Sequence, residues 1–176
     1  MKKIILVLLS LIFTSSLIGC SNADASNKIT ISKENKSKLH MEVDYKISNL
    51  KNEDYTLKIY TKEYKKGKII NDENFAQTEM TISDISSINV EVCENDGNLE
   101  ITTGDSFLSF PLNFYDNNMI FSSIDNSKEI DLNKEYPIAV YSNGSKVKSV
   151  NINDFKNKLQ LGNNDYDLVV YLKLTK

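Results

Sequence analysis

Three residues that can bind a metal ion follow one another at every second position early in the chain. His40, Glu42 and Asp44 alternate with apolar residues, so an extended strand would place their side chains on one face. Same-face neighbours in a strand are about 7 Å apart, whereas zinc ligands converge at about 2 Å from the ion. At most two of the three could share an ion, and other ligands would have to come from elsewhere. We therefore predict a solvated strand face, with no metal and no other cofactor.

A serine beside an acid is the second candidate for chemistry. The segment Gly104-Asp105-Ser106-Phe107-Leu108 resembles the Gly-Asp-Ser nucleophile block of GDSL-type esterases. The resemblance implies a hydrolase in which a histidine downstream of Ser106 serves as general base. The single histidine, His40, lies upstream, and Gly-Asp-Ser is equally typical of a turn before a strand. We predict the turn, and no catalytic residue.

Two weaker patterns complete the search for reactive groups. Cys93 could be a catalytic thiol, but with one histidine in the chain we interpret it as a quiet, partly buried cysteine. Asn163, Asp165 and Asp167 match the first ligand positions of a calcium loop, but no glycine follows at the sixth position and Leu174 occupies the twelfth. We interpret this segment as the polar end of a hairpin.

The elements that would position these residues are short strands. Apolar residues alternate with polar ones over residues 39–47, 55–59, 88–92 and 166–174, and shorter candidates lie at 29–31, 78–82, 99–102, 107–110, 119–121 and 137–141. Turn-forming groups such as Lys66-Gly67, Asp96-Gly97 and Asn143-Gly144 separate them. Only Asn153 to Gln160 predicts a short helix. The pattern predicts an all-β fold over residues 28–176, a single antiparallel β-sandwich of which an immunoglobulin-like arrangement is one version.

The first twenty residues carry a targeting signal. Lys2 and Lys3 precede an apolar run from Ile4 to Phe13, which is too short to cross a membrane. Leu17-Ile18-Gly19-Cys20 then resembles the lipobox of bacterial lipoproteins. The resemblance implies that signal peptidase II removes residues 1–19 and that a diacylglycerol is attached to Cys20. Residues 20–27 would form the lipidated cysteine and its tether, and the domain would lie at the outer face of the cell membrane.

Composition limits the function classes further. The chain has no arginine and is rich in lysine, asparagine and isoleucine, which is typical of an AT-rich genome and suggests a Gram-positive host. Lipidation of Cys20 leaves Cys93 as the remaining thiol, so no intramolecular disulfide can form. We find no phosphate-binding loop and no nucleic-acid platform, and we expect a monomer.

Two surface patterns point to a binding partner. Lys58, Tyr60, Lys62 and Tyr64 share the outward parity of one strand, and mixed aromatic and cationic side chains can bind anionic polymers or lipid headgroups; the alternative is an edge strand protected by lysines. Charge is also segregated, because residues 69–127 contain no lysine and 11 acidic residues. This segment could form one acidic surface, or its acids could pair with the lysines of residues 58–68 inside the fold.

These patterns favour a lipid-anchored binding module at the cell envelope, whose partner is an envelope protein or polymer, over an enzyme. The alternatives from other classes are a hydrolase built on Ser106 or on a metal site around His40, and an envelope inhibitor that blocks a lytic enzyme with an exposed loop.

Overall fold

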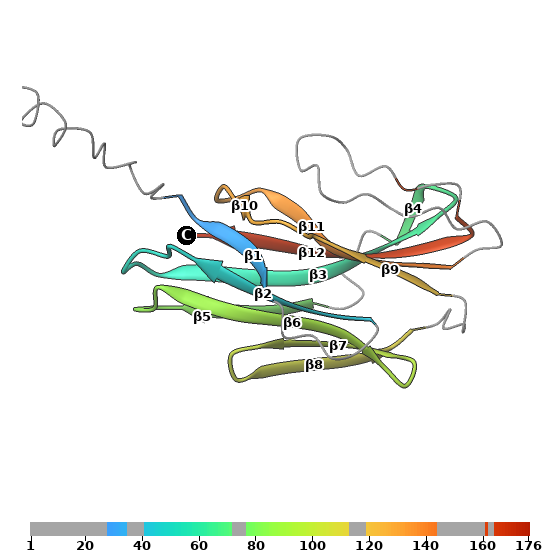
Figure 1. Cartoon of the computed structure of the whole chain (residues 1–176), viewed down its shortest axis with the longest axis horizontal. Coiled ribbons are helices and arrows are strands. Elements are labelled where there is room, and N and C mark those ends of the chain that lie inside the picture. The colour runs from blue at the N-terminus through green and yellow to red at the C-terminus, as the bar shows by residue number, and fades with distance from the viewer. Residues whose placement is uncertain (1–27, 35–40, 72–76, 113–118, 144–160, 162–163) are drawn as a thin grey trace, which may run out of the picture.

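The fold consists of strands only, in the part of the chain that the computed structural model describes: residues 28–34, 41–71, 77–112, 119–143, 161 and 164–176. Two antiparallel sheets pack together, and most strands run along the long axis of the molecule (Figure 1). Sheet A has the order β10-β1-β2-β6-β7-β8, with bounds β1 Thr30–Glu34, β2 Glu42–Ser48, β6 Ser87–Asn95, β7 Asn98–Thr103, β8 Ser106–Pro111 and β10 Lys128–Glu129. Sheet B has the order β4-β3-β12-β11-β9, with β5 also paired to β3, and bounds β3 Tyr55–Lys65, β4 Lys68–Asn71, β5 Gln77–Ile82, β9 Ile120–Ser123, β11 Glu135–Asn143 and β12 Tyr166–Thr175.

The core lies between the two sheets and follows the alternation of the sequence. Val43, Tyr45 and Ile47 of β2 are fully buried, while the residues between them are partly exposed. The same parity buries Ile88, Val90 and Val92 of β6 and Leu99 and Ile101 of β7 on sheet A, and Leu57 and Ile59 of β3 and Leu168, Val170, Leu172 and Leu174 of β12 on sheet B. Burial of these side chains is the main favourable term in folding.

Tight turns join neighbouring strands where the sequence predicts them. Lys66-Gly67 links β3 to β4, and Asp96-Gly97 links β6 to β7; all four residues have positive φ angles between 50° and 79°. This conformation suits two-residue hairpins because its twist matches that of the strands.

Two tyrosine hydroxyls tie the sheets together across the core. Tyr45 on β2 donates to the carbonyl of Ile138 on β11 and accepts from the amide of Ile124. Tyr141 on β11 donates to the carbonyl of Met41, which precedes β2. Burial raises the pKa of both hydroxyls well above the ordinary value. Both groups therefore stay protonated and keep their donor roles at physiological pH.

The structure confirms the predicted all-β sandwich, while its immunoglobulin-like version is not confirmed. The short strands β4 and β10 have no counterpart among the predicted elements. The predicted helix from Asn153 to Gln160 lies outside the described residues. Among the residues that are described, no helix is long and apolar enough to cross a bilayer.

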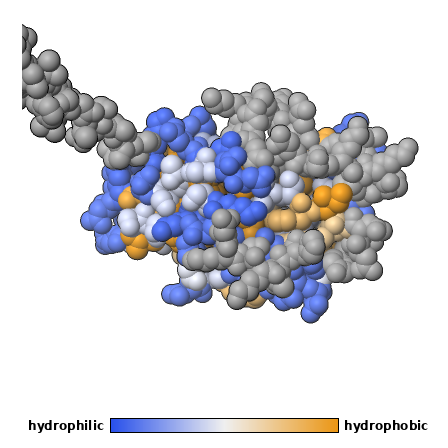
Figure 2. Space-filling model, in the orientation of Figure 1, coloured by the Kyte–Doolittle hydropathy of each residue, from blue (hydrophilic) through white to orange (hydrophobic). Residues whose placement is uncertain are grey.

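The two ends of the sandwich differ in the chain ends that lie there and in how hydrophilic their surface is. β1 begins at the end where the chain also finishes (Figure 1). Ion pairs join Lys28 to Glu129 and Lys176 to Glu53 at this end. The face of the molecule seen in Figure 2 is mostly hydrophilic there, and its larger hydrophobic area lies toward the opposite end.

Candidate functional site

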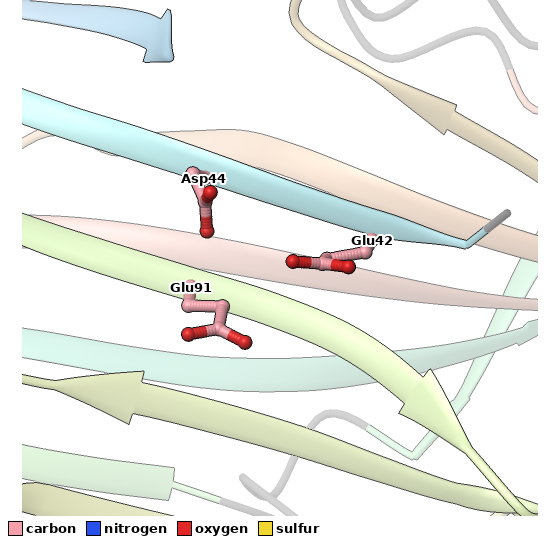
Figure 3. A group of neighbouring side chains, drawn as sticks. All are labelled: Glu42, Asp44 and Glu91. Atoms are coloured by element: carbon pink, nitrogen blue, oxygen red, sulfur yellow. The ribbon is translucent and has the colours of Figure 1, made fainter. Parts of the chain in front are cut away.

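Three carboxylates meet on the outer face of sheet A. Glu42 and Asp44 come from β2, and Asp44 is paired in register with Glu91 on the neighbouring strand β6. All three side chains lie on the face that points away from the core, and one oxygen from each lies within 4.8 Å of the others. Figure 3 shows the carboxylates of Glu42 and Asp44 directed toward the side of β2 on which Glu91 lies.

The cluster differs in one member from the metal-ligand pattern seen in the sequence. Glu42 and Asp44 do approach each other, and the third carboxylate, that of Glu91, comes from another strand. Sequence reasoning missed Glu91, because its place beside Asp44 depends on a pairing between strands 47 residues apart. His40 lies outside the described residues.

Neighbouring carboxylates on the outer face of sheet A raise one another's pKa and that of a nearby thiol. The pKa of Glu91 is raised, first by burial and then by the charges of Asp44, Glu42 and Glu100. The pKa of the Cys93 thiol is raised to about 12, first by burial and then by Glu100, Glu91 and Glu42. Every charge that shifts these two groups is a carboxylate, so a cation near Glu91 would be stabilised.

A groove lies beside the carboxylate cluster, and Asp44 and Glu91 are among the residues that line it. Its volume is about 600 Å³, within the usual range for small-molecule sites. Four acids from separate elements line it, namely Glu34, Asp44, Glu91 and Asp105. Met80 and Ile85 contribute apolar surface, and the side chain of Ile85 is 40% exposed. The groove thus combines carboxylates with apolar contacts, which suits a molecule that has a cationic group and an apolar part.

The turn that precedes Ser106 lines one side of this groove. Gly104 and Asp105 link β7 to β8, Thr103 is paired with Ser106, and Gly104 has a φ of 55°.

The comparisons with known proteins add no family to this geometry. No family model matches the chain, and neither a curated protein nor a solved structure matches it.

The structure supports the turn interpretation of the Gly-Asp-Ser segment. Ser106 is the first residue of β8, directly after a two-residue hairpin turn.

Cys93 is buried, with 7% of its surface exposed, and its thiol donates to Glu100 at 3.8 Å. A thiol with a raised pKa is a poor nucleophile. The burial of Cys93 agrees with the prediction from the sequence.

The expected exposed face of Lys58, Tyr60, Lys62 and Tyr64 is wrong for its two tyrosines. All four point away from the core, as their parity predicts, but Tyr60 is only 3% exposed and Tyr64 only 9%. Tyr60 stacks on Tyr171 with ring centroids 5.7 Å apart. Tyr64 is hydrogen-bonded through its hydroxyl to the hydroxyl of the same Tyr171, so the three tyrosines interact with one another on this face.

The two lysines of this set are already engaged. Each ammonium group lies 5.8 Å from the centroid of the Tyr60 ring. Lys62 also pairs with Glu135 at 3.0 Å, and its side chain is only 15% exposed. The aromatic and cationic groups therefore interact with each other within sheet B.

The acidic segment 69–127 divides between the two sheets. Glu91 and Glu100 lie on sheet A, in the carboxylate-rich environment described above, whereas Glu79 of β5 is paired in register with Lys58 of β3. For the described acids of this segment, neither one acidic surface nor complete pairing with the lysines of residues 58–68 accounts for all of them. The lipobox residues Leu17, Ile18, Gly19 and Cys20 lie outside the described residues.

Proposed function

We propose that this chain is a lipid-anchored protein of the outer face of the cell membrane, and that its β-sandwich binds a cationic partner without catalysing a reaction. The observation that carries the binding role is the groove on sheet A, because it brings four carboxylates and apolar side chains together in one concave surface. The sequence Leu17-Ile18-Gly19-Cys20 supports the anchor.

The partner that fits best is a basic segment of an envelope protein or polymer. Lysine and arginine side chains combine a cationic head with an apolar stem. The head would meet Asp44 and Glu91 while the stem lies against Met80 or Ile85. The mixed lining therefore favours a basic chain molecule over a bare metal ion.

Titration of the full chain, purified in detergent, with a lysine-rich peptide tests the binding role. We expect binding at low salt that weakens steeply as salt is added, because exposed charges interact over a Debye length of about 8 Å at physiological ionic strength. Calcium ions should compete with the peptide for the carboxylates. The double variant Asp44→Asn, Glu91→Gln should weaken peptide binding at least about fivefold, equivalent to about 1 kcal/mol.

The matched control is Glu79→Gln, which removes an exposed acid from β5 on the other sheet and should leave peptide binding unchanged. If the wild-type protein does not bind the peptide at low salt, or if both variants lose affinity equally, the groove is not the binding site.

Metabolic labelling with palmitate tests the anchor separately. Cys20→Ala removes the thiol to which the lipid would be joined, so we expect no label and loss of the protein from the membrane. Label that still enters the Cys20→Ala protein would refute the anchor and leave the groove proposal standing.

A further inference from the structure

A buried acid, Asp167, belongs to a hydrogen-bonded cluster that joins three segments of the chain at the end of sheet B where β12 begins. The hydroxyl of Ser142, near the end of β11, donates to Oδ1 of Asp167 at 2.6 Å. The side-chain amide of Asn164 donates to the same oxygen, also at 2.6 Å. The backbone amide of Lys66, in the turn between β3 and β4, donates to the carbonyl of Asn164 at 3.0 Å. This end lies opposite the C-terminus (Figure 1).

Two oxygens of this cluster have no hydrogen-bond donor. Asp167 is fully buried and Asn164 is 2% exposed. Oδ2 of Asp167 and Oδ1 of Asn164 are both buried without a hydrogen bond. A buried polar atom that loses its bonds to water without gaining others carries a free-energy penalty, and an ionised carboxylate carries a larger one. With Asp167 ionised, both oxygens would carry this penalty at once.

A single proton on Oδ2 of Asp167 would give both of these oxygens a hydrogen bond. We infer that Asp167 is protonated in the folded protein and forms a reciprocal acid–amide pair with Asn164. In this pair the amide of Asn164 donates to Oδ1 of Asp167, and the carboxyl O–H on Oδ2 of Asp167 donates to Oδ1 of Asn164. Each side chain then gives one hydrogen bond and receives one, and Ser142 supplies the second bond to Oδ1.

The groups that face Asp167 are consistent with a neutral acid. Burial is the largest influence on its pKa and raises it, while the hydrogen bonds from Ser142 and Asn164 lower it less. Tyr64 is the residue paired with Asp167 on β3, and its hydroxyl is hydrogen-bonded to the hydroxyl of Tyr171.

The nearby charged side chains point elsewhere. Lys66 and Asp165 are exposed, and Lys62 is paired with Glu135. Within the described part of the chain, the hydrogen bonds that reach Asp167 come from neutral groups.

We call the Asp167–Asn164 pair the latch. Its contribution to the stability of the fold depends on pH. Because the pKa of Asp167 is raised in the folded state, its contribution to stability is complete below the ordinary pKa of an aspartate, about 3.9. That contribution is lost as pH rises through the raised, folded-state pKa. At alkaline pH the hydrogen-bonded cluster should therefore stabilise the Ser142 end of β11 and the β3–β4 turn less.

Asp167→Asn tests the latch in the full chain, because an asparagine amide reproduces the donor of the protonated acid and cannot ionise. We expect Asp167→Asn to melt at the wild-type temperature near pH 4 and a few degrees above it at pH 8. The matched control is Asp165→Asn, which removes an exposed acid two residues away and should not produce a gap that grows with pH.

A second measurement does not depend on the variant folding well. The infrared band of a protonated carboxyl group should be present in the wild-type protein at pH 7, well above the ordinary pKa of aspartate, and absent from Asp167→Asn. A melting temperature of Asp167→Asn below that of the wild type at pH 8, or no protonated band at pH 7, would overturn the inference. A melting temperature that falls when EDTA removes divalent ions would assign the two oxygens to a cation instead.

Discussion

The outer faces of the two sheets have similar alternating sequence patterns but differ in how far their side chains are exposed to solvent. On sheet A, the side chains of Glu42, Asp44 and Glu91 point away from the core and remain partly exposed. On sheet B, Tyr60 and Tyr64 also point away from the core, yet both are buried. The comparison teaches that alternation separates the two faces of a strand but does not reveal whether the second face meets water.

The neighbouring strands explain the difference. β12 contains an unbroken apolar run from Leu168 to Leu172, so it presents apolar side chains to both faces. Val169 on the outer face is fully buried, as is Val140 beside it on β11. Strands that are buried on both faces have continuous apolar runs. This run was the signal in the sequence that the outer face of sheet B is not a solvated surface.

The largest effect should come from breaking the buried outer face of sheet B. Tyr171→Ala removes the ring that stacks on Tyr60 and the hydroxyl bonded to Tyr64, and we expect a loss of about 3–5 kcal/mol in the free energy of unfolding. Tyr171→Phe keeps the ring and should cost only about 1 kcal/mol. Urea unfolding measures both. A loss below about 1 kcal/mol for Tyr171→Ala would mean that this face is exposed after all.

A smaller loss should follow from straining the turn beside the groove on sheet A. Gly104 has a φ of 55°, and an added Cβ would meet Met80 at 3.6 Å, an ordinary contact. Gly104→Ala should therefore cost about 1–2 kcal/mol from backbone strain alone, and it should weaken peptide binding in the groove. Ser109→Ala, at an exposed position on the same hairpin, serves as the control in urea unfolding. Equal stability of the two variants would contradict the backbone argument.

Removing a charge from the acidic face should slightly stabilise the protein. The raised pKa of Glu91 means that its ionised form is disfavoured in the folded state, so its contribution to stability is lost as pH rises through the folded pKa. Glu91→Gln should thus be more stable than the wild type at pH 7, by well under 1 kcal/mol because solvent screens this partly exposed group. The difference should shrink near pH 4 and in high salt. Thermal unfolding at several pH values would show this, and a destabilised variant would contradict it.

Another small effect concerns the thiol of Cys93, which donates to Glu100. Burial is the main reason for the raised pKa of Cys93, and Glu100 is the largest electrostatic cause. Glu100→Gln should therefore raise the rate of Cys93 alkylation only about 1.4-fold to 5-fold, the equivalent of about 0.2–1 kcal/mol. A lipid-free Cys20→Ser background leaves Cys93 as the reporter. A much larger acceleration would mean that the carboxylates, and not burial, protect the thiol.

Local patterns predicted most of the strands and hairpins. The strands that contain Val43, Leu57, Val90 and Val170 were all recognisable from alternation, because a strand's two-residue period is visible within a few positions. Turns such as Asp96-Gly97 were recognisable because few residue types adopt positive φ angles. The edge strand β4, Lys68–Asn71, was missed because its sequence does not alternate apolar with polar residues and its first three residues are exposed.

Only part of the candidate site could be predicted from the sequence. Glu42 and Asp44 were visible as same-face acids, but Glu91 joins them through the register of β2 against β6. Asp167 was interpreted as part of a polar hairpin end, and the structure instead buries it against Ser142 and Asn164. No short window of sequence contains either set of partners.

By itself, the sequence determined the strand periods, the two-residue turns and the residues that face the core, because each depends on neighbours along the chain. Only the tertiary structure decided that Glu91 completes a carboxylate cluster, that Tyr60 and Tyr64 are buried, and that Asp167 has two buried donors. These outcomes depend on which distant strands pair and in what register, and a one-residue shift in register would turn each of these side chains to the other face of its sheet.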